Sequence, residues 1–128
     1  MVKTMAIIFG VVFLAVGILG FVPGATTDMN GMPMLLGIFH VNAVHNCVHL
    51  ASGLVFLLCG MAGAGPSRMF FRIFGLVYAL VAVLGFLKPE GPVLGYISNN
   101  MPDVWLHVVL AAAMLFLGFL APADTATA

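Results

Sequence analysis

The chain has 128 residues, of which 63% are apolar and only 6% are charged, and its four basic residues balance four acidic ones. A soluble domain carries roughly 25% charged residues, so this composition excludes a soluble globular protein. The zero net charge also excludes nucleic acid as a main partner. We therefore expect an integral membrane protein with the lipid bilayer as its solvent.

Four apolar runs are long enough to cross a bilayer, which takes about 20 apolar residues in a helix, and Arg72 at the start of the third is their one Lys, Arg, Asp or Glu. They cover residues 5–22, about 41–60, 69–87 and about 104–120. No segment shows the alternation over about ten residues that a membrane-spanning strand requires. The sequence therefore predicts an all-α fold, a bundle of four transmembrane helices in a single domain over residues 1–128.

The first run, residues 5–22, also resembles the start of a signal peptide, because a basic residue, Lys3, precedes an apolar stretch. The run is long for such a peptide, however, and no Ala-x-Ala cleavage site follows it. Residues 21–24 (FVPG) indicate a helix that ends in a turn instead. We expect the run to be retained as a transmembrane helix.

The basic residues predict the orientation, since short cytoplasmic connections collect Lys and Arg. Lys3, Arg68 and Arg72 fall on one side of the predicted bundle, and only Lys88 falls on the other. We expect both termini and the connection 63–67 to be cytoplasmic. The tail that carries Asp124 would lie on the same side.

The two halves of the chain resemble each other. GILGFVP at residues 17–23 matches AVLGFLKP at residues 82–89. At a second constant separation, Leu36-Gly37 corresponds to Leu94-Gly95, Asn42 to Asn100, His45 to Asp103, His49 to His107 and Gly53 to Ala111. The sequence predicts two tandem helical-hairpin repeats, about 5–60 and 69–120, that are parallel and enter the membrane in the same direction.

The second and fourth predicted helices contain ionisable side chains near their starts. His45 and His49 are four residues apart, as are Asp103 and His107, so each pair lies on one helical face. Parallel repeats would bring all four to a similar depth, in the outer third of the bundle. Ionisable groups inside a membrane are costly and usually face the bundle interior, so we predict a shared polar cluster.

Two asparagines stand where these helices are predicted to begin. Asn100 precedes Asp103 by three residues, with Pro102 between them, which is typical of a capping arrangement at a helix N-terminus. Asn42 occupies the corresponding position in the first repeat. We predict that both side chains cap their helices.

Three interpretations of the polar cluster remain open. In the first, His45 donates to Asp103 and His49 meets His107, so that hydrogen bonds lock the two repeats together. In the second, the imidazoles and the carboxylate hold zinc or copper, or His49 and His107 bind a haem or a chlorin. In the third, the groups belong to a proton or ion path.

Other residues carry weaker signals. Cys47 and Cys59 would lie roughly 18 Å apart on one helix at about 1.5 Å per residue, too far for a disulfide. His40 is interpreted as a solvated or interfacial residue. The thioethers of residues 29, 32 and 34 hint at a soft copper site, although most of the nine methionines are interpreted as packing residues. No catalytic motif is present, so we expect no enzymatic activity.

Three segments resemble a bacterial membrane family catalogued as domain of unknown function 4383. They are GILGFVPG at residues 17–24, LLG at 35–37 leading to HNCVHL at 45–50, and DVWLH at 103–107. The resemblance covers about residues 8–120 and implies four transmembrane helices in a small bacterial protein, and hence a place in a bacterial inner membrane, with no established activity or ligand. The sequence departs from the family's pattern at Val104 and Ala111, where members usually have a polar residue and a glycine.

We therefore predict a small non-enzymatic structural or accessory subunit that packs against a larger membrane complex. The alternative is a membrane protein that binds a metal, haem or chlorin through the cluster of His45, His49, Asp103 and His107. A small transporter or channel component is a third possibility.

Overall fold

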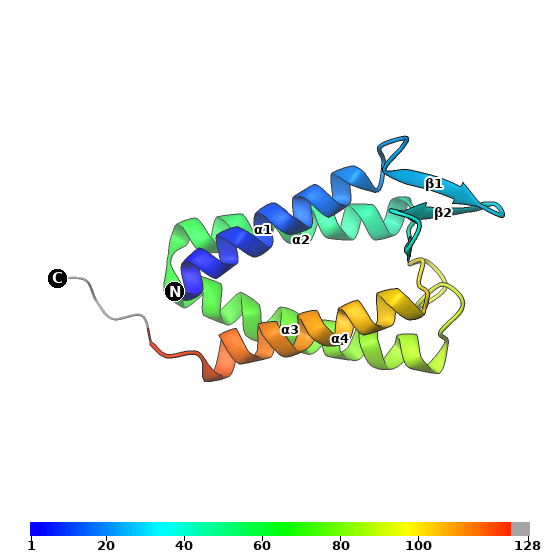
Figure 1. Ribbon diagram of the computed structural model, residues 1–128. Coiled ribbons are helices and arrows are strands. Elements are labelled where there is room, and N and C mark those ends of the chain that lie inside the picture. The colour runs from blue at the N-terminus through cyan, green and yellow to red at the C-terminus, as the bar shows by residue number, and fades with distance from the viewer. Residues whose placement is uncertain (124–128) are drawn as a thin grey trace.

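The fold is mostly helical, as predicted, with four helices long and apolar enough to cross a membrane. The computed structural model describes residues 1–123, and the predicted tail with Asp124 lies outside them. The helices are α1 (Val2–Leu19), α2 (Ala43–Ala62), α3 (Ala64–Leu87) and α4 (Met101–Leu115), and α4 continues into a π-helical turn, η1 (Phe116–Leu120). α1 and α3 run away from the end that holds Met1, and α2 and α4 run back toward it (Figure 1).

The helix ends differ from the predicted runs by a few residues. α1 already begins at Val2, and α3 begins at Ala64, so the predicted connection 63–67 shrinks to Gly63. Gly63 turns the chain with a φ of 124°, in the left-handed region that favours glycine. Pro66 fits into the first turn of α3 because a proline there removes an N–H that would have no helical partner.

A small three-stranded antiparallel sheet lies between α1 and α2, which the all-α prediction did not include. Its strands are β1 (Thr26–Met29), β2 (Met32–Leu35) and β3 (Phe39–His40), in the order β1-β2-β3. Asn30 and Gly31 form the turn between β1 and β2, with φ values of 58° and 80°. Two positive φ values are typical of the type I′ hairpin turn. β1 and β2 project beyond the helices (Figure 1).

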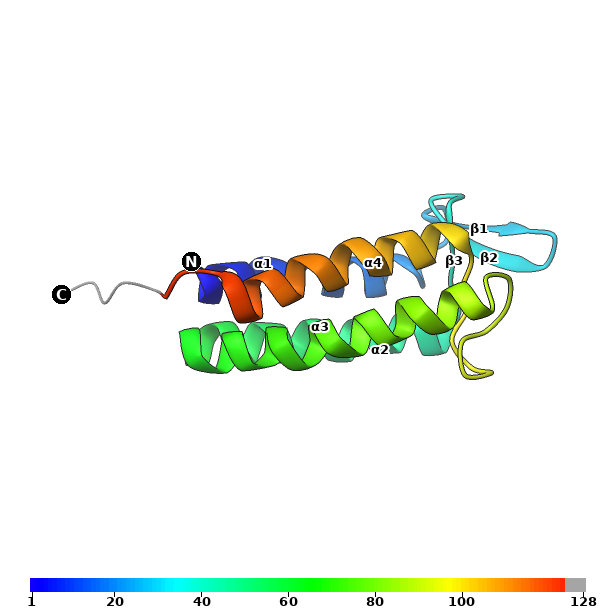
Figure 2. The ribbon, with the colours of Figure 1, turned by 90° about the horizontal axis from the view of Figure 1, so that it is seen from below.

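The helices pack as two pairs, α1 with α2 and α3 with α4. Glycines bring the backbones together within each pair. A Cβ atom on Gly10 of α1 would lie 2.9 Å from the carbonyl oxygen of Gly53 on α2, and one on Gly75 of α3 would lie 3.1 Å from the backbone nitrogen of Leu115 on α4. Small residues allow such close approach between helices in lipid. Figure 2 shows all four helices along one long axis, with the sheet at one end.

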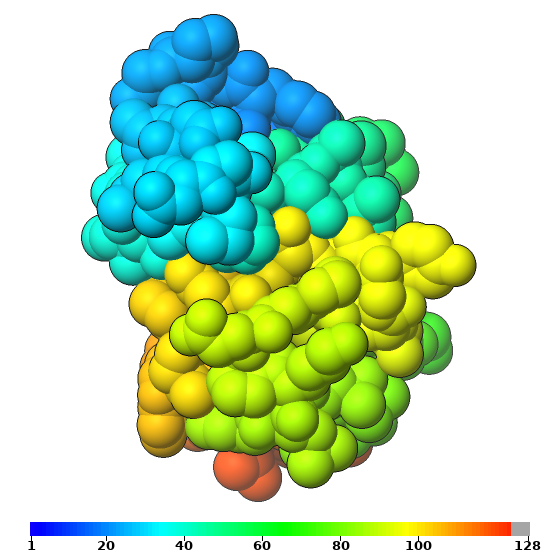
Figure 3. Space-filling model, turned by 90° about the vertical axis from the view of Figure 1, so that its right-hand side faces the viewer, coloured from blue at the N-terminus to red at the C-terminus, as the bar shows by residue number. Residues whose placement is uncertain are grey.

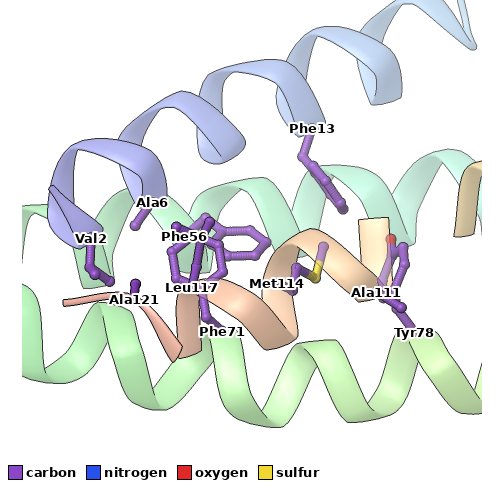
Figure 4. Close-up of a cluster of buried hydrophobic side chains, with 10 residues drawn as sticks. All are labelled: Val2, Ala6, Phe13, Phe56, Phe71, Tyr78, Ala111, Met114, Leu117 and Ala121. Carbon is purple, nitrogen blue, oxygen red and sulfur yellow. The ribbon is translucent and has the colours of Figure 1, made fainter. Parts of the chain in front are cut away.

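An apolar core joins the two pairs. Figure 4 shows its members, which come from all four helices: Val2, Ala6, Phe13, Phe56, Phe71, Tyr78, Ala111, Met114, Leu117 and Ala121. The ring centroid of Phe56 lies 5.5 Å from that of Phe13 and 5.2 Å from that of Phe71. Aromatic pairs at such distances add to the stabilisation from burial. The core therefore holds α1 and α2 against α3.

Two arginines of α3 bind the C-terminal end of the fourth span. Nε of Arg72 donates to the carbonyl of Gly118 at 2.7 Å, and Nη1 and Nη2 of Arg68 donate to the carbonyls of Ala121 and Pro122, each at 2.9 Å. The last carbonyls of a helix have no partner within the helix, and basic side chains can satisfy them. The two charges are thereby held at the end of the bundle opposite the sheet.

Candidate functional site at the polar end of the bundle

The predicted polar residues gather at the end of the bundle where the sheet lies, beginning with the two asparagines. Oδ1 of Asn42 accepts from the backbone N–H of His45 at 2.8 Å, and Oδ1 of Asn100 accepts from the backbone N–H of Asp103 at 3.2 Å. Asp103 returns the second bond, because its Oδ2 accepts from the backbone N–H of Asn100 at 3.0 Å. The pair Asn100 and Asp103 therefore forms a capping box.

The same two asparagines connect the hairpins. Nδ2 of Asn42 donates to the carbonyl of Tyr96, before α4, at 2.8 Å. Nδ2 of Asn100 donates to the carbonyl of Ile38, before α2, at 2.9 Å. Each hairpin thus gives one amide donor and one carbonyl acceptor to the other, and the two bonds form a reciprocal pair.

Two similar turns present these carbonyls. The turn before Ile38 contains Leu36 with a φ of 53°, and the turn before Tyr96 contains Leu94 with a φ of 54°. Each leucine is followed by a glycine that also has a positive φ. Positive φ is uncommon for a residue other than glycine, so the same unusual backbone conformation occurs at matching places in the two hairpins.

The three histidines lie close together, although their partners differ from those predicted. Nδ1 of His45 donates to the backbone carbonyl of Ser98 at 3.1 Å, in place of the predicted bond to Asp103. Since a carbonyl only accepts, this Nδ1 carries a proton. The ring of His45 stacks on that of His49 with centroids 4.8 Å apart and lies 6.5 Å from that of His107. No hydrogen bond joins His49 to His107 within residues 1–123.

Aromatic side chains enclose the other two imidazoles. The ring of Phe13 lies 5.0 Å from that of His49, and the ring of Tyr78 lies 5.3 Å from that of His107. Both histidines are buried, and the Nδ1 atom of each is enclosed without a hydrogen-bond partner. An unpaired buried polar atom costs about 1–3 kcal/mol. In a native protein such an atom calls for a specific explanation, such as a functional role or a bound water or ion.

A cavity of about 350 Å³ adjoins these rings. Its lining combines polar and apolar residues of α2, α3, α4 and the connection before α4: His45, Val48, His49, Ala51, Ser52, Phe74, Val77, Tyr78, Val81, Leu94, Ile97 and His107. The hydroxyl of Ser52 is turned back to the carbonyl of Val48 at 2.6 Å. The imidazoles and the hydroxyl of Tyr78 are therefore the principal hydrogen-bonding groups that this largely apolar cavity offers. Its volume falls within the range of about 300–1,000 Å³ typical of small-molecule sites.

The cluster does not form the tetrahedral metal centre that one interpretation required. Among the residues described, no three His, Cys, Asp or Glu side chains lie close enough to hold a metal ion. The carboxylate of Asp103 is engaged in its capping box. The rings of His45 and His49 are inclined by only 11°, so they lie face to face, and their nitrogens do not converge on one point.

Sequence reasoning missed two participants in this site. Tyr78 lies on α3, outside the two helices that carry the predicted polar cluster. Ser98 contributes a backbone carbonyl, which no residue type reveals. A hydroxyl in the otherwise apolar stretch 73–87 was the signal available for Tyr78. His40, which was left outside the cluster, has its backbone close to both His45 and Asp103.

Comparison of the chain with curated proteins and with solved structures finds no match. One protein family, described as Domain of unknown function (DUF4383), has a sequence model that matches residues 3–120. The match includes both hairpins and all the polar residues of the site, and it agrees with the resemblance seen in residues 45–50 and 103–107. The chain therefore belongs to the family described as Domain of unknown function (DUF4383).

Proposed function

We propose that this protein is a non-enzymatic structural or accessory subunit that packs against a larger membrane complex. In this proposal the chain is a duplicated helical hairpin in a bacterial inner membrane, with both termini in the cytoplasm. The observation that carries the proposal is the reciprocal pair of hydrogen bonds from the side-chain amides of Asn42 and Asn100 to the carbonyls of Tyr96 and Ile38. These bonds join the two hairpins at the polar end of the bundle.

Matching contacts at matching positions support the duplication. Gly20 packs against Asn46, and Gly85, at the corresponding place in the other hairpin, packs against Val104. Further pairs of contacts correspond in the same way: Gly10 with Leu57 and Gly75 with Leu115, Gly60 with Ile7 and Gly118 with Arg72, Phe13 with His49 and Tyr78 with His107. Two hairpins built alike and joined by exchanged bonds form a scaffold without need of a ligand.

The outer surface of the bundle supports lateral packing. Large apolar side chains such as Leu58, Leu76 and Val109 are exposed on three different helices. Lipid or a partner's transmembrane helices can cover such a surface. The basic residues Lys3 and Arg68 at the end opposite the sheet support a cytoplasmic position for that end.

Native purification in a mild detergent tests the accessory role. We expect the tagged protein to migrate as part of a larger assembly and to copurify with a membrane protein in a fixed ratio. The double variant Asn42→Ala/Asn100→Ala should weaken the scaffold and reduce the yield of the assembly, whereas Gly65→Ala, where an added Cβ would meet nothing within 4 Å, should leave it unchanged. A protein that migrates alone under every extraction condition would contradict the proposal.

The cavity beside the histidines favours a second candidate function, the binding of a lipid-soluble molecule. His49 and His107 have enclosed Nδ1 atoms, so only the Nε2 side of each ring is free to meet a molecule in the cavity. Apolar walls with a few hydrogen-bonding groups are typical of small-molecule sites. Such a ligand would be held by hydrogen bonds and ring contacts.

The same purification tests this candidate. Solvent extraction followed by mass spectrometry should recover a bound small molecule, and an absorption spectrum should reveal it if it is a pigment or haem. Val81→Trp fills the cavity and should abolish the bound molecule, while Val83→Trp, at an exposed position of the same helix, should not. Extracts that are identical for both variants and the parent protein would eliminate this candidate.

A further inference from the structure

One face of the small sheet carries soft sulfur ligands and an imidazole. Side chains directly opposite each other in antiparallel strands share a face, as do residues two apart on one strand. The register pairs Met29 with Met32 and Met34 with His40. Because Met32 and Met34 are two apart on β2, all four side chains lie on the same face.

This face borders a cleft between the sheet and the connection that precedes α4. The cleft has a volume of about 490 Å³, and Met32, Met34 and His40 line one wall. Glu90, Gly91, Pro92, Asn99 and Asn100 line the other. Figure 3 looks onto this end of the molecule, where the sheet (blue to cyan) covers one half and residues 88–100 (green to yellow) cover the other.

We propose that Met32, Met34 and His40 bind a soft monovalent metal ion of the Cu(I) or Ag(I) type. Thioether sulfur selects Cu(I) among biological metals, and imidazole nitrogen suits copper as well. Mg²⁺ and Ca²⁺ prefer oxygen ligands, so the site discriminates against them. The carboxylate of Glu90 in the opposite wall offsets the positive charge of the ion.

The geometry allows the sulfur atoms of Met32 and Met34 and a ring nitrogen of His40 to reach one metal ion. Cβ atoms directly opposite each other in an antiparallel pair lie about 4.5–5.5 Å apart, which applies to Met34 and His40. Methionine has three rotatable bonds, so Met32 can turn its sulfur toward the same point. The ring of His40 makes no hydrogen bond within the described part of the chain, and its nitrogens are free to act as ligands.

The test uses the full chain in detergent micelles with methionine methyl groups labelled with carbon-13. Ag(I) serves as a probe that resembles Cu(I) and is not oxidised in air. We expect Ag(I) to shift the methyl signals of Met32 and Met34 and the ring signals of His40, with saturation at one equivalent. The methyl signal of Met69, which is exposed on α3, should stay in place, and Mg²⁺ should shift none of these signals.

Substitution by leucine gives a second measurement, since it preserves side-chain volume and removes the sulfur. We expect Met32→Leu/Met34→Leu to weaken Ag(I) binding at least about tenfold and Met69→Leu to leave it unchanged. Equal affinity in the double variant and the parent chain would overturn the proposal, as would equal shifts at Met69 or an equal response to Mg²⁺. The signals of the parent chain remain decisive if the double variant fails to fold.

Discussion

At the scale of single residues, Asn42 and Asn100 each perform two tasks. An amide side chain offers an oxygen that accepts and a nitrogen that donates, so one residue caps its own helix and bonds to the opposite hairpin. Aspartate or serine would also cap a helix, but neither retains an amide N–H to reach the carbonyls of Tyr96 and Ile38. The geometry therefore explains why asparagine stands at both helix starts.

Replacing Asn42 separates its two tasks. Asn42→Ser keeps a side-chain oxygen that can cap the helix and should lose only the bond to Tyr96, which costs about 0.5–1.5 kcal/mol. Asn42→Ala loses both bonds and should cost about 1 kcal/mol more, the typical value of a helix cap. Thermal unfolding in detergent, followed by circular dichroism, should rank the parent protein first, Asn42→Ser second and Asn42→Ala last.

The second asparagine supplies the control for this ranking. Asn100→Ser and Asn100→Ala should follow the same order, because Asn100 makes the corresponding bonds. If the serine and alanine variants unfold at the same temperature at both positions, the capping bonds contribute nothing measurable. If the serine variants match the parent protein, the bonds between the hairpins contribute nothing.

At the scale of helices, each hairpin depends on close approach of two backbones. On α2, a Cβ atom at Gly53 would meet the backbone nitrogen of Leu14 at 2.8 Å and the carbonyl oxygen of Gly10 at 2.9 Å. These neighbours are backbone atoms, which move only if the whole helix moves. Lipid offers little hydrophobic driving force between helices, so packing of this kind carries much of their association.

The variant Gly53→Ala tests this dependence. One added methyl group should push α1 and α2 apart and lower the free energy of unfolding by about 1–3 kcal/mol, the usual cost of overpacking. The matched control is Gly65→Ala in α3, where an added Cβ would meet nothing within 4 Å. Alanine favours a helix over glycine by up to about 1 kcal/mol, so the control should be neutral or slightly stabilised. Equal melting temperatures for the two variants would contradict the close approach.

At the scale of the whole molecule, hydropathy was sufficient to predict the four helices, because a long apolar run has few alternatives in lipid. The sheet was missed, although Asn30-Gly31 is a common hairpin signal, because its strands are too short for their alternation to be noticed. The bond from His45 to Ser98 was also beyond prediction. That bond depends on the path of the connection before α4, which no local pattern in the sequence specifies.

The cluster itself could be predicted in part. The spacing of His45 with His49 and of Asp103 with His107 placed these residues on common helical faces, and the structure brings the three imidazoles together. The role of Asp103 depends on its position in the first turn of α4, where a carboxylate can reach back to Asn100. The spacing of residues along a helix predicts which side chains share a face. Their hydrogen-bond partners depend on the backbone conformation at the start of the helix and in the connection before it.

The arrangement of the two hairpins predicts how the protein lies in the membrane. The sheet and residues 88–100 occupy the same end of the bundle (Figure 2), and α1 with 18 residues spans about 27 Å at 1.5 Å per residue, close to the hydrocarbon thickness of about 30 Å. Thr27 and Glu90 should therefore face the same side of the membrane, and Gly65 the other.

Cysteine labelling in intact cells measures this directly, in a background in which Cys47 and Cys59 are replaced by alanine. A maleimide that does not cross membranes should label Thr27→Cys and Glu90→Cys alike and reach Gly65→Cys only after the cells are permeabilised, because the basic residues of that end favour the cytoplasm. Labelling of Thr27→Cys and Glu90→Cys from opposite sides would show that the hairpins are inverted relative to each other. If intact cells label only Gly65→Cys, the hairpins are parallel but the whole bundle has the opposite orientation. That outcome remains compatible with the hydrogen bonds of Asn42 and Asn100 between the hairpins, because these bonds require only that both polar ends lie on one side of the membrane.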